Sequence, residues 1–254
     1  MGIQLPGSSF VNPDTELREL LTAYAVELLA NNAREENGKA LFELIDEKTM
    51  VNAIVGLLAT GGSTNHTIHI IAIAKAAGII INWDDFSDLS EVVPSITKVY
   101  PNGAADVNHF HASGGMGFVI KTLLENGYLH EDVNTILGKG LSKFKQEPKI
   151  ENGRIVYKDG AAESLNDSIL RSAKNPFSPV GGITVMAGNL GRAVIKSSAV
   201  NENNYIVNAP AIVFEEQEDL ILAFKKGELN KDFVAVLPFQ GPKANGMPEL
   251  HKLM

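Results

Sequence analysis

The first third of the chain shows a helical pattern of apolar and polar positions. Residues 17–28 carry apolar side chains three and four positions apart, after a turn signal at Asn12-Pro13-Asp14-Thr15. Similar spacing starts near Asp46 and runs to a pair of glycines, and it resumes over residues 68–77 before Gly78. The pattern predicts three helices, the last of them ended by a glycine that suits a C-terminal cap.

The following segments alternate short apolar runs with turn signals. The β-branched run at residues 79–83 predicts a buried strand, and residues 84–93 predict a helix. Residues 105–111 show alternating side chains and are predicted to be extended. A second glycine-rich corner at residues 113–117 leads into a predicted helix over residues 118–124. Two such corners, each at the entrance of a helix, favour a shared pocket.

Beyond Leu141 the pattern changes. Residues 143–162 are charged and carry turn signals at Asn152-Gly153 and Asp159-Gly160, which predict a linker or an excursion with a small hairpin. Short β-rich segments and one helix, at 216–226, follow; the strands are predicted at residues 183–186, 193–196, 205–208, 211–214 and 233–237. The fold class is therefore predicted to be α/β, with a helix-rich α/β part over residues 1–165 and an incomplete β-barrel-like domain over residues 175–254.

Composition and charge narrow the class of protein. Hydrophobic residues make up 44% of the 254 residues, as in ordinary globular proteins, and the net charge of -8 argues against a general nucleic-acid binder. The longest apolar stretch is interrupted by His69, Lys75 and Gly78, and the first ten residues do not resemble a signal peptide. We therefore expect a cytoplasmic protein with no membrane and no nucleic-acid partner. The chain contains no cysteine, so it supplies no disulfide and no thiolate ligand.

The polar residues after the first glycine pair are the leading candidates for ligand binding. Gly61 and Gly62 permit a tight turn or a close approach to a ligand, and Ser63, Thr64 and Asn65 supply helix caps and hydrogen-bonding side chains. A helix that starts here favours an anion such as carboxylate or phosphate. An ordinary capped corner between two helices is the competing interpretation. We call residues 61–65 the glycine corner.

Histidines near both corners have several possible roles. His66 and His69 share a helix face, which suits a metal pair, but no third ligand follows at a matching spacing, so a position on a pocket wall is preferred. Asp106, His109 and His111 suit general acid or base chemistry or, equally, hydrogen bonding at the end of a strand. Neither group identifies a reaction by itself.

A carboxylate near the end of the chain is the candidate metal ligand. Glu249 follows Gly246-Met247-Pro248 in a long loop that proline and glycine stiffen. A carboxylate held in this way suits a hard divalent cation. A local cap or ion pair is the alternative role for Glu249.

Several strings resemble the dihydroxy-acid and sugar-acid dehydratase superfamily, and the resemblance runs from end to end of the chain. Within it, the chain is most similar to the branch that dehydrates 6-phosphogluconate. The strings are Leu5-Pro-Gly-Ser-Ser-Phe-Val-Asn-Pro13, Leu58-Ala-Thr-Gly-Gly-Ser-Thr-Asn-His-Thr67, Ile81-Asn-Trp-Asp-Asp-Phe-Ser-Asp88, Pro101-Asn-Gly103, Asn175-Pro-Phe-Ser-Pro-Val-Gly-Gly182 and Gly241-Pro-Lys-Ala-Asn-Gly-Met-Pro-Glu249.

The resemblance implies that this chain is an internal fragment. Members of the superfamily are longer, with iron-sulfur cysteines upstream of the matched region and a proposed serine base downstream. The implied architecture is the second half of an α/β domain followed by the first part of a swivelling β/β/α domain. No catalytic residue then lies within the chain, and the isolated chain is expected to be a non-catalytic piece.

The resemblance also implies a chemistry. A hydro-lyase of the Entner-Doudoroff pathway converts 6-phospho-D-gluconate to 2-keto-3-deoxy-6-phosphogluconate, with a 4Fe-4S cluster and a divalent cation such as Mg²⁺ as cofactors, in a homodimer. Glu249 matches the metal-site glutamate, and Ser63, Thr64 and Asn65 match a motif placed near the substrate. Lys243, Asn245 and His251 favour a phosphorylated substrate, because an acidic protein needs local donors for phosphate. A branched dihydroxy acid or a non-phosphorylated sugar acid is the alternative substrate.

Overall fold

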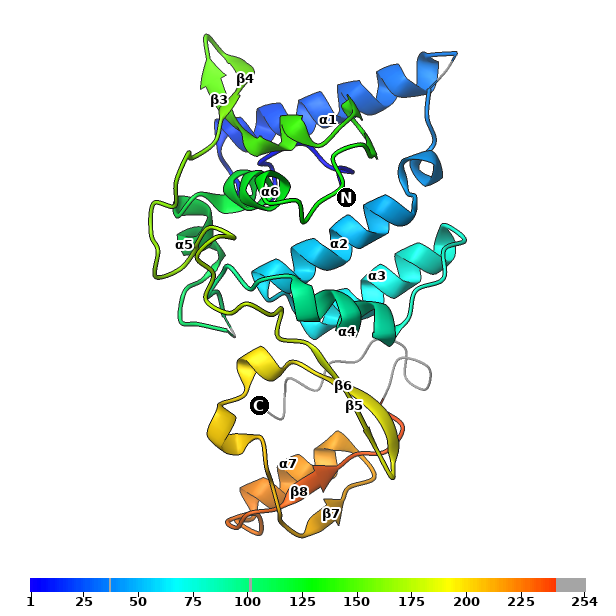
Figure 1. The fold of residues 1–254 in the computed structure, drawn as a ribbon, viewed down its shortest axis with the longest axis vertical. Coiled ribbons are helices and arrows are strands. Elements are labelled where there is room, and N and C mark those ends of the chain that lie inside the picture. Colours follow the sequence, from blue (N-terminus) through cyan, green and yellow to red (C-terminus); the bar gives the residue numbers. More distant parts are fainter. Residues whose placement is uncertain (37, 101, 241–254) are drawn as a thin grey trace. The chain divides into compact units, whose positions relative to one another are not determined.

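The computed structural model describes residues 1–36, 38–100 and 102–240 (Figure 1). The chain forms two compact units, Met1–Val200 and Asn201–Met254. The first unit holds six of the seven α-helices described here, together with the glycine corner. The predicted division at residues 165–175 stays a prediction.

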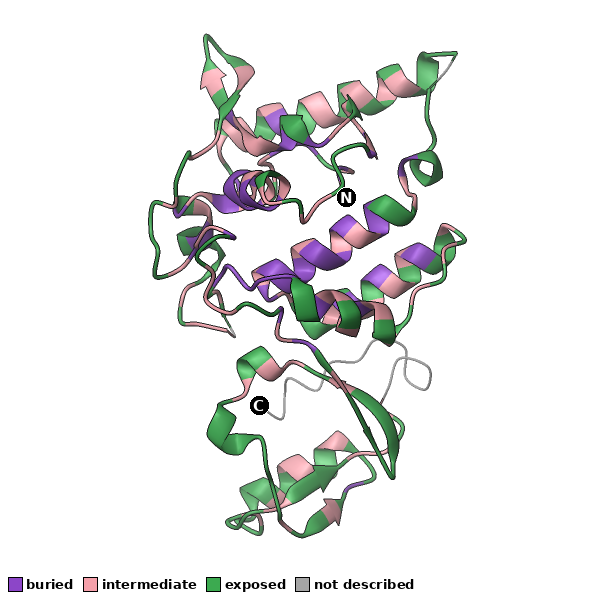
Figure 2. Ribbon diagram, viewed as in Figure 1, coloured by how far each residue is buried: buried purple, intermediate pink, exposed green. Residues whose placement is uncertain are grey.

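Helices build the core of the first unit. They are α1 (Glu16–Arg34), α2 (Glu47–Thr60), α3 (Thr64–Ala76), α4 (Trp83–Val92), α5 (Val107–Ala112) and α6 (Gly115–Glu125), and a 3-10 turn at Leu41–Leu44 lies between α1 and α2. Helix α2 packs against α3 and α4, and buried residues line much of α2 and α6 (Figure 2). The core residues with the least exposure include Met50, Ile54, Leu58, Phe86, Val119 and Leu123. The helices predicted over residues 17–28, 68–77, 84–93 and 118–124 are confirmed.

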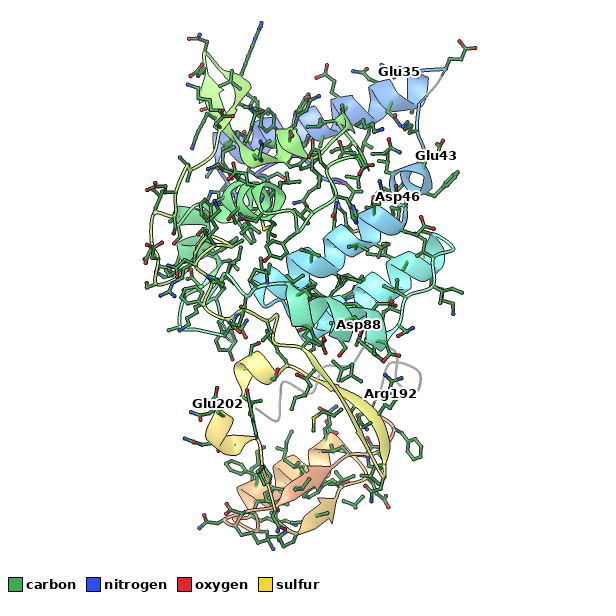
Figure 3. The ribbon with its side chains drawn as sticks, in the orientation of Figure 1. Glu35, Glu43, Asp46, Asp88, Arg192 and Glu202 are labelled. Carbon is green, nitrogen blue, oxygen red and sulfur yellow. The ribbon has the colours of Figure 1, made fainter. Side chains whose placement is uncertain are left out.

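Helix α2 begins and ends where the sequence pattern indicates. Asp46, labelled in Figure 3, caps its first turn, because the Oδ1 atom accepts a hydrogen bond of 2.8 Å from the backbone N–H of Thr49. Gly61 follows the last helical residue with φ 60° and ψ 40°. This left-handed conformation is strained for residues that carry a Cβ atom, so glycine is required at this turn.

Two predicted extended segments form no strand. Residues 79–82 form no strand, and α4 starts at Trp83 because Asn82 caps it by accepting a hydrogen bond of 2.6 Å from the Asp84 N–H. The prediction over residues 105–111 is also wrong. Asp106 accepts hydrogen bonds of 2.9 Å from two backbone amides and starts α5 there. In both cases a capping side chain outweighed the β-branched or alternating pattern.

The strands form four two-stranded sheets among the described residues. Three are antiparallel hairpins: β1 (Asn134–Thr135) with β2 (Gly138–Lys139), β3 (Gln146–Glu151) with β4 (Arg154–Asp159), and β5 (Thr184–Gly188) with β6 (Gly191–Ile195). The β3–β4 turn at Asn152-Gly153 has positive φ at both residues, which confirms the predicted hairpin. A 3-10 turn at Ser142–Lys145 leads into β3, and another at Ser197–Ala199 follows β6.

The second unit is described from residue 201 to residue 240. Strand β7 (Ala211–Val213) pairs in parallel with β8 (Val234–Val236), and α7 (Gln217–Lys225) connects them. The strand predicted at residues 205–208 is absent; a 3-10 turn at Glu202–Asn204 precedes that segment. The α/β class is confirmed, and no closed barrel forms within the described ranges.

The segment before β5 packs closely on the end of α2. The backbone N–H of Gly181 donates a hydrogen bond of 2.8 Å to the Ser90 carbonyl, and a Cβ atom at Gly181 would lie 2.9 Å from the Leu58 Cβ. Glycine therefore permits this close approach. Arg192 of β6, labelled in Figure 3, also pairs with Asp84 of α4. These contacts hold the β5–β6 hairpin beside the helix that ends at the glycine corner.

Candidate functional site

The two glycines of the corner bond back to the helix they end. The Gly62 N–H donates to the Leu57 carbonyl over 2.9 Å, and the Gly61 N–H donates to the Leu58 carbonyl over 3.3 Å. This pair of bonds around a left-handed glycine is a Schellman motif. The glycine amides are therefore used within the turn. Any anion-binding capacity of the corner belongs to the first turn of α3.

The carbonyl groups at the end of α2 accept hydrogen bonds from three other parts of the chain. The first part is the segment at residues 96 and 97. The Ile96 N–H donates to the Ala59 carbonyl over 2.8 Å, and Thr97 Oγ1 donates to the Thr60 carbonyl over 2.7 Å. These bonds satisfy acceptors that a helix leaves without partners at its C-terminus.

The carbonyls of the glycine pair are bonded by side chains. Asn102 Nδ2 donates to the Gly61 carbonyl over 2.9 Å. Lys196 Nζ donates to the same carbonyl over 2.6 Å and to the Gly62 carbonyl over 3.0 Å. Ser198 Oγ in turn donates to Asn102 Oδ1 over 3.1 Å. Every backbone donor and acceptor of the glycine pair thus has a partner.

The polar residues of the corner begin helix α3. Ser63 is the N-cap, and its Oγ atom accepts a hydrogen bond of 3.1 Å from the Asn65 N–H. Ser63 and Thr64 are exposed, and Asn65 is half-buried. The corner is therefore a capped junction between two helices, and it also presents hydroxyl groups and a helix N-terminus to solvent.

A cavity of about 560 Å³ adjoins the corner. Gly61, Gly62 and Ser63 line it, together with His66 and His69 from the next turns of α3. Much of the remaining wall is apolar and comes from α2, α5 and α6. The cavity is large enough for a small organic acid, and Ser63 and the two histidines are among the polar residues of its wall.

The second glycine-rich corner, residues 113–117, contributes Met116 to the same cavity, so both corners line one pocket, as the sequence predicts. His111 lines a separate hollow of about 310 Å³ with Glu147 and the N-terminal residues. Burial raises the pKa of Glu147, although the charge of His111 and a 3.3 Å hydrogen bond from the Gly117 N–H oppose that shift. Burial also raises the pKa of Tyr157 to about 12, and its hydroxyl has no hydrogen-bond partner among the described residues.

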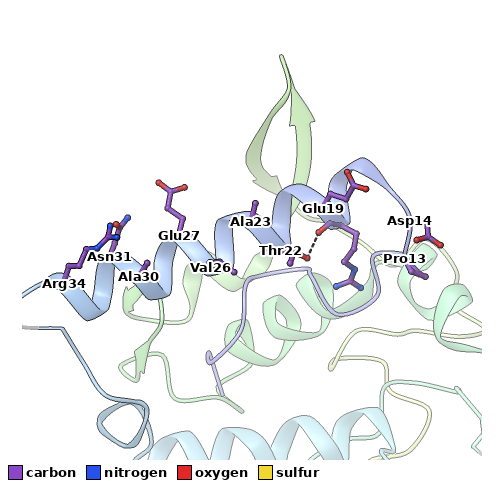
Figure 4. A pocket seen from close by; sticks show the side chains of 11 residues that line it. Pro13, Asp14, Glu19, Thr22, Ala23, Val26, Glu27, Ala30, Asn31 and Arg34 are labelled. Carbon is purple, nitrogen blue, oxygen red and sulfur yellow. Dashed lines mark hydrogen bonds between the residues drawn. The ribbon is translucent and has the colours of Figure 1, made fainter.

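Another hollow lies away from both corners. Its volume is about 870 Å³, and it runs along the outer face of α1 and the turn before it (Figure 4). Its lining comes from residues 13–34 alone, so no second described element encloses it. A surface on one helix offers little shape for recognising a small molecule.

The remaining predicted residues are structural or lie outside the described ranges. Asp106 caps α5 and forms a 2.8 Å pair with His109 Nδ1, and the hydrogen bond from the His109 backbone lowers the Asp106 pKa. This arrangement is helix capping, in place of the predicted strand-end bonding. Lys243, Asn245, Glu249 and His251 lie outside the described residues.

The described residues do not fit an iron-sulfur cluster or a chelated metal. The chain has no cysteine, and within residues 1–36, 38–100 and 102–240 no three histidine, aspartate or glutamate side chains gather as a metal site. His66 and His69 therefore line the cavity wall without a third ligand of those types. In the same part of the chain, no helix is both long and apolar enough to cross a membrane.

Comparison with known protein families decides the class. The family model described as dihydroxy-acid/6-phosphogluconate dehydratase N-terminal matches residues 1–144, and the corresponding C-terminal model matches residues 168–254. The chain belongs to the dihydroxy-acid/6-phosphogluconate dehydratase family. The matches thus confirm the resemblance carried by the sequence strings. The C-terminal model includes Lys196, whereas the N-terminal model includes the glycine corner to which Lys196 bonds.

The chain is more similar to relatives named phosphogluconate dehydratase than to a relative named dihydroxy-acid dehydratase. Phosphogluconate dehydratase of Escherichia coli (strain K12) is 55% identical over 100% of this chain, and that of Helicobacter pylori (strain J99) is 52% identical over 100%. Dihydroxy-acid dehydratase of Caldanaerobacter subterraneus is 32% identical over 98%. The chain spans only 42% of the length of the first two relatives and 43% of the third.

Sequence reasoning missed Lys196 and Asn102 as residues of the corner. Asn102 lies in the Pro101-Asn-Gly103 string, which gave a signal for a turn but none for its partner. Lys196 follows a short strand and has no motif in the sequence that connects it with residues 61–65. Both side chains donate hydrogen bonds to backbone carbonyls. Every residue has such a carbonyl, so no pattern of side chains in the sequence pointed to these contacts.

Proposed function

We propose that the whole protein carrying these 254 residues is a phosphogluconate dehydratase. It removes water from 6-phospho-D-gluconate: a base takes the C2 proton, hydroxide leaves C3, and the enol tautomerises to 2-keto-3-deoxy-6-phosphogluconate. The main support is the contrast in identity, 52–55% to the phosphogluconate dehydratases named above against 32% to the dihydroxy-acid dehydratase. The reaction belongs to the Entner-Doudoroff pathway.

The described residues contribute substrate binding to this proposal. The substrate carries a carboxylate and a phosphate, and a chain with a net charge of -8 needs local donors to hold them. Ser63, Thr64 and Asn65 provide such donors at the start of α3, beside the cavity. His66 and His69 add ring nitrogens along the same wall.

The residues beyond the described ranges complete the proposed site. Lys243, Asn245 and His251 contribute positive charge or hydrogen bonds to the phosphate, and Glu249 is a ligand for a divalent cation such as Mg²⁺. Because the chain lacks cysteine, thiolate ligands for a 4Fe-4S cluster have to come from other parts of the whole protein. We also propose that the whole protein is a cytoplasmic homodimer.

Substrate assays test this function directly. The whole protein is supplied with 6-phosphogluconate, with a non-phosphorylated sugar acid and with a branched dihydroxy acid, and formation of the 2-keto acid is measured. We expect the highest kcat/KM with 6-phosphogluconate. A preference for dihydroxyisovalerate would overturn the assignment and favour the dihydroxy-acid branch of the family.

The isolated 254-residue chain is a separate case. We propose that it is not catalytic, because it holds no thiolate for the cluster that the family implies. The same assay, run on the isolated chain after reconstitution with iron and sulfide, tests this statement. Turnover above that of a blank without protein would contradict it.

A further inference from the structure

The glycine pair of the corner has no side chains through which its position can be fixed. Its N–H groups are used inside the α2 turn, as described above. The carbonyl groups are therefore the remaining points at which the rest of the protein holds this turn. They receive bonds from Asn102 and Lys196, and those residues are 41 and 135 positions from Gly61.

Lys196 does more than satisfy a carbonyl group at the C-terminal end of α2. A cation near the C-terminus of a helix is favourable by itself, and Asn102 already supplies one donor to the Gly61 carbonyl. Lys196 also bonds to the carbonyl of Gly62, the residue directly before the α3 cap, Ser63. One ammonium group therefore joins the last turn of α2 to the first residues of α3.

The environment of Lys196 restricts its side chain. The residue is half-buried, and burial lowers the pKa of its ammonium group. Both bonds are short enough to fix the ammonium within the turn, at 2.6 Å and 3.0 Å. The backbone of Lys196 is held too, because it lies between β6 and the 3-10 turn at Ser197–Ala199.

We propose that Lys196 is a positioning residue for the substrate-binding corner. By holding the carbonyls of Gly61 and Gly62, it fixes the direction in which α3 starts and so the placement of Ser63, Thr64 and Asn65. This role rests on the proposed function, since it assumes that the corner binds the substrate. A small displacement of such groups is costly, because a shift of about 1 Å in a binding group can lower turnover roughly 100-fold.

Three variants of the whole protein test the proposal. Lys196→Met keeps most of the apolar stem and removes the donors, whereas Lys196→Arg keeps the charge and can bond two carbonyls. Lys75→Met is the matched control, because Lys75 is an exposed lysine in the last turn of α3, away from the corner. Steady-state kinetics with 6-phosphogluconate are measured for each variant well below its melting temperature.

The kinetic result expected for Lys196→Met is a rise in KM of roughly 10-fold and a fall in kcat/KM of roughly 10- to 100-fold. Lys196→Arg should recover most of this loss, and Lys75→Met should match the wild-type protein. If Lys196→Met lowers only the melting temperature and leaves KM and kcat unchanged, the residue merely stabilises the fold and the proposal is wrong.

Amide hydrogen exchange gives a second measurement that needs no activity. We expect faster exchange in residues 61–67 of Lys196→Met than in the wild-type protein, and no change in Lys75→Met. Unchanged exchange in these residues would overturn the proposal. If the wild-type protein dehydrates none of the three acids, the proposed function fails, while the exchange rates still decide whether Lys196 holds the corner.

Discussion

Asn52 and the backbone of His130 form a reciprocal pair of hydrogen bonds. Asn52 Nδ2 donates to the His130 carbonyl over 2.9 Å, and Asn52 Oδ1 accepts from the His130 N–H over 2.8 Å. Asn52 is only 4% exposed and lies in the middle of α2. The pair therefore ties the central helix to the segment that follows α6, and it gives the buried side chain of Asn52 partners for both its oxygen and its nitrogen.

Replacing Asn52 by alanine should destabilise the protein strongly. The substitution leaves the N–H and the carbonyl of His130 without these partners, and the loss of two hydrogen bonds costs about 1–3 kcal/mol of unfolding free energy. Urea unfolding of the whole protein measures the change. Asn108→Ala is the control, because Asn108 is exposed and its side chain has no hydrogen-bond partner among the described residues. A loss within experimental error for Asn52→Ala would show that the pair is not important for stability.

Gly61→Ala should disturb both stability and substrate binding. A Cβ atom would overlap the Asn102 amide, and the residue has positive φ, so the variant should lose about 2 kcal/mol of unfolding free energy. KM for 6-phosphogluconate should rise as well, because Asn102 has to move.

Gly56→Ala is the matched control for that variant. Gly56 lies inside α2, and a Cβ atom there would contact nothing within 4 Å. Alanine favours the helix, so the control should gain about 0.5–1 kcal/mol of unfolding free energy. Equal losses in the two variants would contradict a special requirement for glycine at position 61.

Glu147 should make stability depend on pH in the acidic range. Its pKa is raised above 4.5 in the folded protein by burial, so the folded state takes up a proton before the unfolded state does as the pH falls. The charged carboxylate therefore reduces stability at neutral pH, and protonation relieves that cost. The stability gained by protonation of Glu147 is lost as the pH rises through the pKa that this residue has in the folded protein.

The Glu147→Gln variant isolates this effect. At neutral pH it should be as stable as the wild-type protein or more stable, and the difference should shrink as the pH is lowered towards 4.5. Unfolding free energies of both proteins across this range are the measurement. A difference that is constant with pH would mean that Glu147 has the same pKa in the folded and unfolded states.

Glu249→Gln tests the proposed metal ligand. The substitution keeps the volume of the side chain and removes its charge, so the affinity for Mg²⁺ and the turnover number should fall while the melting temperature changes little. Isothermal titration with Mg²⁺ gives the affinity independently of turnover. Normal magnesium affinity together with a normal dehydration rate would eliminate the ligand role.

The sequence by itself determined the elements whose causes are local. Helices α1, α2 and α3 follow from apolar spacing, from the caps Thr15 and Asp46 and from the left-handed Gly61, all of which act within about four residues. It also determined the family, because several strings match it over the whole length. Where local signals competed, as at Asn82 and Asp106, the pattern of apolar residues gave the wrong element and the cap decided.

Only the tertiary structure decided which residues hold the glycine corner. The acceptors are backbone carbonyls, which are the same in every residue, and the donors Asn102 and Lys196 come from segments far away in the chain. No side-chain pattern connects such partners, because their meeting depends on how β6 and the segment around residue 102 pack beside α2. The binding motif could therefore be recognised from residues 61–65, whereas the lysine that positions it became visible only in the folded chain.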